Sequence, residues 1–137
     1  DPDPALFASR RVVRIGSLPF EQLPGLANLA AVLIMPYADL PVTRAMQPLK
    51  LKEYLATSKP AVVRDLPATR EWSDCLDLVA TPEAFSQAVR GRLNDGLSAE
   101  QRQARIRLLD ESWDQKARQF ERWAMDAKVG LNGSHAG

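Results

Sequence analysis

The stretch Ala31-Val32-Leu33-Ile34-Met35-Pro36 carries the clearest signal of the fold in this sequence. Its first five residues form a continuous apolar run, and Pro36 ends the run. Continuous rather than alternating apolarity indicates a strand that is covered on both faces, and parallel sheets are built from such strands. We therefore predict a buried strand over 31–35, in a sheet with helices on both sides.

Further strands and helices alternate on either side of this run. Val12–Ile15 is a β-branched run that Gly16 stops, and we expect it to be the first strand. The other expected strands are 60–63 and 76–79, and the expected helices are 22–30, 48–56, 66–72, 82–93, 98–110 and 113–125. This alternation favours an α/β fold with a doubly wound, mostly parallel sheet and C-terminal helices.

Composition limits the class of protein. The chain has 137 residues, 45% of them hydrophobic and 26% charged, which is the size of one domain with one core. The formal net charge of +1 gives no electrostatic reason to expect a nucleic-acid partner. The single cysteine, Cys75, cannot form an internal disulfide, and no apolar run reaches the roughly 18 residues of a membrane-spanning helix. We expect a cytoplasmic protein, and peripheral contact at the inner face of the membrane is compatible with this.

The loop after Met35 is the most informative candidate site, because open parallel sheets bind ligands beyond the carboxyl ends of their strands. It leads to a helix beginning near Pro48, whose first amides, those of Leu49 and Lys50, favour an anion. Lys50 can contact a phosphate, and Glu53, on the same face, can accept hydrogen bonds from ribose hydroxyls. Spacing alone favours a simpler interpretation, an exposed ion pair between the two side chains.

The segment 48–56 resembles a signature of GT-B glycosyltransferases. Pro48-Leu49-Lys50-Leu51-Lys52-Glu53-Tyr54-Leu55-Ala56, followed by Lys59-Pro60-Ala61-Val62-Val63, is similar to the family pattern P-L-K-L-x-E-Y-L-A-x-x-K-P-V-V. The likeness extends to 12–16, 23–24, 32–37, 66–67, 70–71 and 112–114. The resemblance implies a Rossmann-like sheet within a GT-B fold. Within that fold, the chain resembles the C-terminal, donor-binding domain of group 1 or family 4 enzymes.

This resemblance also implies substrates and site residues. The enzyme would move a sugar from a UDP- or GDP-sugar to a glycan, lipid-linked or polysaccharide acceptor, with no further cofactor and no metal. Lys50 would contact the phosphates of the donor and Glu53 its ribose. Tyr37 would border the sugar pocket, or would pack its ring on the end of the sheet. Further donor contacts would come from Met46, Gln47 and Leu49.

Two departures from the family pattern leave the donor sugar and the stereochemical course open. Many relatives carry another Glu eight residues before the ribose-binding one, where this chain has Ala45, and they usually have Asp where it has Ala31. The resemblance begins after the first β-α-β segment of such a domain, and we expect the chain to be a fragment of an enzyme whose acceptor-binding N-terminal domain lies outside it. We therefore expect a donor-binding domain over 1–126, inactive without its N-terminal domain, and a flexible tail over 127–137.

Two other classes of protein compete with the transferase interpretation. A receiver domain has a strand-Met-Pro segment and a Lys-Pro pair, but it needs an Asp just before its Met-Pro pair, where this chain has Ile34. A non-enzymatic α/β interaction module would present Trp113, Phe120 and Trp123 to a partner, although such aromatics more often pack on the sheet. Binding of a nucleoside diphosphate near Lys50 distinguishes the transferase from both alternatives.

Overall fold

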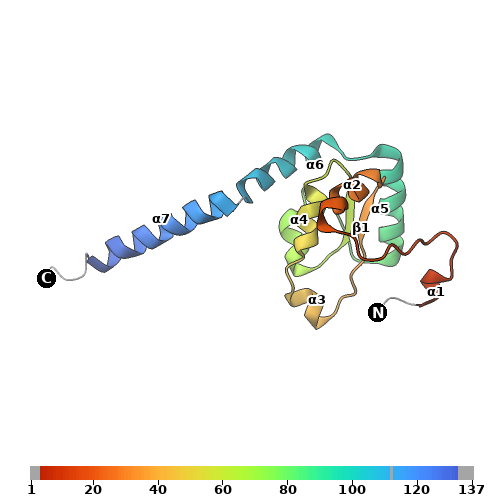
Figure 1. Ribbon diagram of the computed structural model, residues 1–137, viewed down its shortest axis with the longest axis horizontal. Helices are drawn as coiled ribbons and strands as arrows, with labels where there is room; N and C mark the ends of the chain where they lie inside the picture. The colour runs from red at the N-terminus through yellow and green to blue at the C-terminus, as the bar shows by residue number, and fades with distance from the viewer. Residues whose placement is uncertain (1–3, 112, 133–137) are drawn as a thin grey trace.

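A three-stranded parallel sheet lies at the centre of the protein (Figure 1). The structure, a computed structural model, describes residues 4–111 and 113–132. The strands β1 (Leu33–Met35), β2 (Ala61–Arg64) and β3 (Asp77–Val79) are hydrogen-bonded in the order β1-β2-β3. The α/β class and the parallel sheet predicted from the sequence are therefore confirmed.

Most of the predicted helices are present. The described helices, with 3-10 helices marked η, are α1 (Pro4–Phe7), η1 (Phe20–Gln22), α2 (Leu23–Leu29), α3 (Pro41–Ala45), α4 (Leu49–Leu55), η2 (Pro67–Trp72), α5 (Pro82–Asp95), α6 (Ala99–Ala104), η3 (Arg105–Glu111) and α7 (Trp113–Asn132). The helices predicted over 22–30, 48–56, 66–72 and 82–93 correspond to α2, α4, η2 and α5. The helix predicted over 98–110 divides into α6 and η3.

Local sequence sets both ends of α5. The side chain of Thr81 accepts a hydrogen bond from the amide of Ala84 at 3.2 Å, which caps the N-terminus. Gly96 follows the helix with a φ of 70°, a conformation that glycine adopts without a steric penalty. The apolar side chains of Phe85 and Val89 on this helix are half-buried.

One face of the sheet carries the hydrophobic core. The buried cluster consists of Met35, Leu51, Leu55, Ala61, Val63, Trp72, Cys75 and Leu76. Leu51 and Leu55 of α4 are each 2% exposed, and Tyr54 packs against the cluster from its edge. The apolar side of α4 therefore faces the core.

Among the described elements, coverage of the opposite face is limited to β2 and β3. Helix α5 packs on these two strands, where Val62 is fully buried. Arg92 of α5 donates to the Asp77 carboxylate from Nε at 2.6 Å and from Nη2 at 2.8 Å. Ile34 in β1 remains 47% exposed, so the prediction that 31–35 is buried on both faces is wrong. One helix, about 10 Å wide, covers about two strands, and α5 leaves β1 open.

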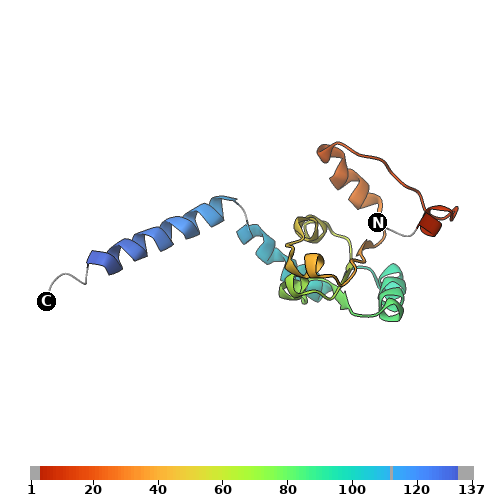
Figure 2. The ribbon, with the colours of Figure 1, turned by 90° about the horizontal axis from the view of Figure 1, so that it is seen from below.

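The segment before β1 does not join the sheet. Residues 12–19 have no regular secondary structure, and Val12, Val13 and Ile15 are 41%, 81% and 51% exposed. The prediction of a first strand over Val12–Ile15 is therefore wrong. A strand needs a neighbour to take up its amides and carbonyls, and no described residue pairs with this segment in a sheet. Figure 2 shows the N-terminal helices α1 and α2 lying to one side of the sheet.

Helix α7 extends away from the sheet as a single long helix (Figures 1 and 2). Its 20 residues span about 30 Å, and Phe120 and Trp123 are 70% and 62% exposed. The helix runs to Asn132, beyond the predicted end at 125. The predicted tail therefore overlaps α7, and its remainder lies outside the described residues. Among the helices that the structure describes, none has the length and apolarity needed to cross a membrane.

Candidate functional site

The predicted donor-binding residues lie between the end of β1 and the second turn of α4, at the carboxyl edge of the sheet (Figure 1). Tyr37 follows the end of β1, and Met46 and Gln47 follow α3. Leu49, Lys50 and Glu53 lie on α4. Tyr37 and Met46 are half-buried, whereas the other four side chains are exposed. This is the edge at which parallel sheets bind ligands.

Lys50 and Glu53 lie on the first two turns of α4 without pairing with each other. Among the described residues, neither side chain has a hydrogen bond or an ion pair. The ion pair that spacing alone favours is therefore not formed in the described structure. Both charged groups remain available to a ligand.

The first turn of α4 also has free backbone donors. Pro48 precedes the helix and provides no side-chain cap. The amide of Leu51 donates to the carbonyl oxygen of Pro48 at 2.9 Å, whereas those of Leu49 and Lys50 have no acceptor among the described residues. Such amides, together with the helix dipole, favour an anion.

Tyr37 and Tyr54 lie at the border between the candidate site and the core. Both tyrosines are partly buried and pack against the core cluster. Burial raises the pKa of Tyr54, and the nearby Tyr37 and Glu53 raise it further. Tyr37 thus packs against the core just after β1, and its contact with the donor sugar stays a prediction.

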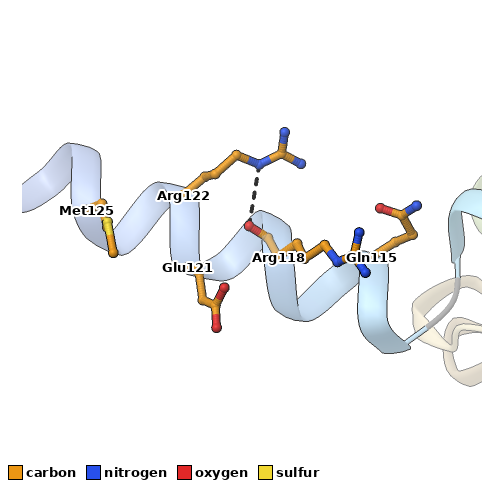
Figure 3. Close-up of a pocket in the computed structure, with 5 residues that line it drawn as sticks. All are labelled: Gln115, Arg118, Glu121, Arg122 and Met125. Carbon is orange, nitrogen blue, oxygen red and sulfur yellow. Dashed lines mark hydrogen bonds between the residues drawn. The ribbon is translucent and has the colours of Figure 1, made fainter.

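The described surface has hollows elsewhere. Gln115, Arg118, Glu121, Arg122 and Met125, all on α7, line the first (Figure 3). Within this group Arg122 Nε donates to the carbonyl oxygen of Arg118, at 3.4 Å. The second lies along α5 between Pro82 and Arg90. Neither contains a predicted donor-binding residue.

A repeated motif lies at the carboxyl edge of the sheet, and the sequence analysis did not detect it. Asp39-Leu40-Pro41-Val42-Thr43-Arg44 follows β1, and Asp65-Leu66-Pro67-Ala68-Thr69-Arg70 follows β2. The two copies share five of six residue types and start 26 residues apart. The repeat is readable in the sequence as D-L-P-x-T-R, but it is far shorter than the units of 20 or more residues that define repeat proteins.

The threonine of each copy closes the start of a short helix. The amide of Leu40 donates to Thr43 Oγ1, and that of Leu66 to Thr69 Oγ1, each at 2.9 Å. Each threonine hydroxyl in turn lies within hydrogen-bonding distance of a carbonyl five residues earlier; for Thr69 this is Arg64, at 3.0 Å. The two copies therefore use the same cap to turn the chain after neighbouring strands.

The arginine of each copy binds its aspartate through two nitrogens. Arg44 Nε and Nη2 lie 2.5 and 2.9 Å from the Asp39 carboxylate, and Arg70 Nε and Nη2 lie 2.7 and 3.4 Å from that of Asp65. The hydrogen bond from Arg44 lowers the pKa of Asp39. We call these two units, Asp39–Arg44 and Asp65–Arg70, the Asp-Arg clasps.

Substitution of the capping threonine by valine is expected to cost a different amount of folding free energy in each of the two units. Thr69→Val keeps the shape of a side chain that is 1% exposed but leaves the Leu66 amide and a carbonyl without their partner. We expect the free energy of unfolding to fall by about 2 kcal/mol. Thr43→Val should cost about 1 kcal/mol or less, because water reaches the half-buried Thr43 cap. Urea denaturation followed by circular dichroism measures both, and equal losses would contradict the argument.

Comparisons with known proteins complete the description of the site. A parallel sheet with free charged groups at its carboxyl edge is typical of α/β ligand-binding proteins. The chain is 40% identical over 58 residues to a protein of Bacillus subtilis (strain 168) named "Putative teichuronic acid biosynthesis glycosyltransferase TuaH". The match spans 42% of this chain and 15% of the relative. No protein family and no solved structure matches the chain. The likeness is thus to a glycosyltransferase, and it is partial.

Proposed function

We propose that this chain is the donor-binding part of a glycosyltransferase that uses a nucleotide-diphosphate sugar. The observation that carries the proposal is the pair of unpartnered, exposed side chains, Lys50 and Glu53, at the carboxyl edge of the sheet. The partial likeness to a glycosyltransferase of teichuronic acid biosynthesis supports the same class. The acceptor, a glycan, lipid-linked sugar or polysaccharide, would bind to another domain of the enzyme.

Each side chain has its own part of the donor to bind. Lys50 and the free amides of Leu49 and Lys50 would hold the diphosphate. Glu53 lies three residues further, about 4.5 Å along the helix axis, and would accept hydrogen bonds from the ribose hydroxyls. Tyr37, which follows the end of β1, would border the sugar. Met46 and Gln47 complete the segment that leads into α4.

Calorimetry with UDP, GDP and the matching nucleosides tests this assignment. Lys50→Ala should weaken the diphosphate by about ten- to a hundredfold and leave the nucleoside unchanged, because only the diphosphate contacts Lys50. Glu53→Ala should weaken both, since both contain ribose. The matched control is Lys52→Ala, which removes a lysine charge from the same helix. Lys52 is directed to the core instead of the proposed site, because its Nζ lies 5.8 Å from the centroid of the Trp72 ring.

These measurements test the location of the binding site and the class of protein separately. Unchanged affinity in Lys50→Ala and Glu53→Ala would refute the site. Failure of the wild-type chain to bind either UDP or GDP would refute the transferase assignment itself. An equal loss in Lys52→Ala would show a general effect of charge instead of a contact.

A further inference from the structure

Three arginines and two aspartates gather where β1 and β2 end. Arg44 and Asp39 form one clasp, Arg70 and Asp65 form the other, and Arg64 is the last residue of β2. The helices that carry the clasps, α3 and η2, lie against each other. Arg64 and Arg70 are also near enough to lower the pKa of Asp39, after the larger effect of Arg44. The group therefore has one positive charge more than its own carboxylates neutralise.

Each clasp arginine has an unused edge. The aspartates occupy Nε and Nη2, and within the described part of the chain Nη1 of Arg44 and of Arg70 has no hydrogen-bond partner. The two side chains are 61% and 65% exposed. A guanidinium has five N–H donors, so about three remain on each, along the edge between Nη1 and Nη2. This edge fits the two oxygens of a carboxylate.

Arg64 contributes its positive charge to this group, but its guanidinium is held by the main chain. Its Nη1 donates to the carbonyl oxygen of Ala80, which ties the end of β2 to the end of β3. Its Nε is buried without a hydrogen-bond partner. The positive charge of Arg64 is therefore held beside the clasps without a carboxylate of its own, which favours an anion at this place.

We infer that Arg44 and Arg70 together bind a carboxylate, and that this carboxylate belongs to an acidic sugar among the substrates. A carboxylate has one negative charge, which matches the surplus, whereas a phosphate monoester carries about 1.5 to 2. Its planar pair of oxygens matches the free guanidinium edges. The inference rests on the proposed function and narrows its substrate class. Arg44 and Lys50 both follow β1, on the successive helices α3 and α4.

A titration of this chain with sodium glucuronate, followed through the arginine Nε–H resonances by NMR, tests the inference. The resonances of Arg44 and Arg70 should shift and saturate. Arg92 is an internal control: it binds Asp77 through the same two nitrogens, but its Nη1 is already engaged by the Gly96 carbonyl at 3.2 Å. Its resonance should not move. Glucose, which lacks the carboxylate, should shift none of the three.

Variants and a competing anion complete the design. Arg44→Gln and Arg70→Gln should each weaken glucuronate by about tenfold or more, and Arg90→Gln, an exposed site on α5, should have no effect. No saturable shift with glucuronate, or an equal shift of Arg92, would overturn the inference. Tighter binding of inorganic phosphate than of glucuronate would overturn the assignment to a carboxylate. None of these outcomes bears on the binding of UDP or GDP at Lys50, so the two proposals fail separately.

Discussion

Arg105→Met is expected to lower the free energy of unfolding by about 3–5 kcal/mol. The Arg105 side chain is 6% exposed and donates to the carbonyl oxygens of Cys75 at 2.9 Å, Thr57 at 3.0 Å and Lys59 at 2.8 Å. Methionine keeps much of the apolar stem but leaves three acceptors without a donor. Urea denaturation followed by circular dichroism measures the loss.

Burying the charged guanidinium also costs free energy, which limits how much stability Arg105 contributes. Burial lowers the pKa of Arg105, because its charged form loses water and gains no bound carboxylate. Arg105→Lys should recover only part of the loss, since an ammonium group cannot reproduce the planar fork. The control is Arg102→Met on the exposed side of α6, which should stay within about 0.5 kcal/mol of the wild type. Equal losses at 102 and 105 would show that burial of Arg105 is not the cause.

The elements predicted correctly are those whose signal is local. A continuous apolar run ended by Pro36 suffices for β1, and an apolar stripe behind Pro48 suffices for α4. Val12–Ile15 has the same β-branched character, yet it forms no strand. A strand depends on a partner elsewhere in the chain, and a short window of sequence does not contain that information.

Burial of polar side chains could not be predicted in the same way. Arg105 stands among Arg102 and Arg107 in a segment that reads as an ordinary charged helix. Its three acceptors lie 30 to 48 residues earlier in the chain. Only the packing of η3 against those loops places the guanidinium inside, so the sequence alone cannot distinguish it from its exposed neighbours.

Of the two candidate sites, one could be predicted from local sequence and the other could not. Lys50 and Glu53 share a helix face, and their spacing was enough to predict it. The Asp-Arg clasps contain a visible repeat, but their proximity follows from β1 and β2 being neighbours in the sheet. Since strand order is a property of the whole fold, the charge surplus near Arg64 could be found only in the structure.

Trp72 is the largest side chain in the core, and two cations flank its ring. Trp72 is 3% exposed, with Arg107 Cζ at 4.6 Å and Lys52 Nζ at 5.8 Å from the ring centroid. Arg107 also donates to the carbonyl oxygen of Glu71 at 2.8 Å. The indole therefore joins α4, η2 and η3 through packing and cation–π contacts.

Trp72→Ala is accordingly expected to lower the free energy of unfolding by about 3–5 kcal/mol from the lost packing and by about 1 kcal/mol more from the cation–π contacts. Since a domain of this size is stable by about 5–15 kcal/mol, much of the chain could unfold. Trp72→Phe, which still fills part of the cavity, should cost about half as much. Trp123→Ala removes the same side chain from α7, where it is 62% exposed, and should change stability by about 0.5 kcal/mol or less. Thermal and urea unfolding followed by circular dichroism measure all three, and a Trp72→Ala loss no larger than that of Trp123→Ala would contradict a core that depends on this ring.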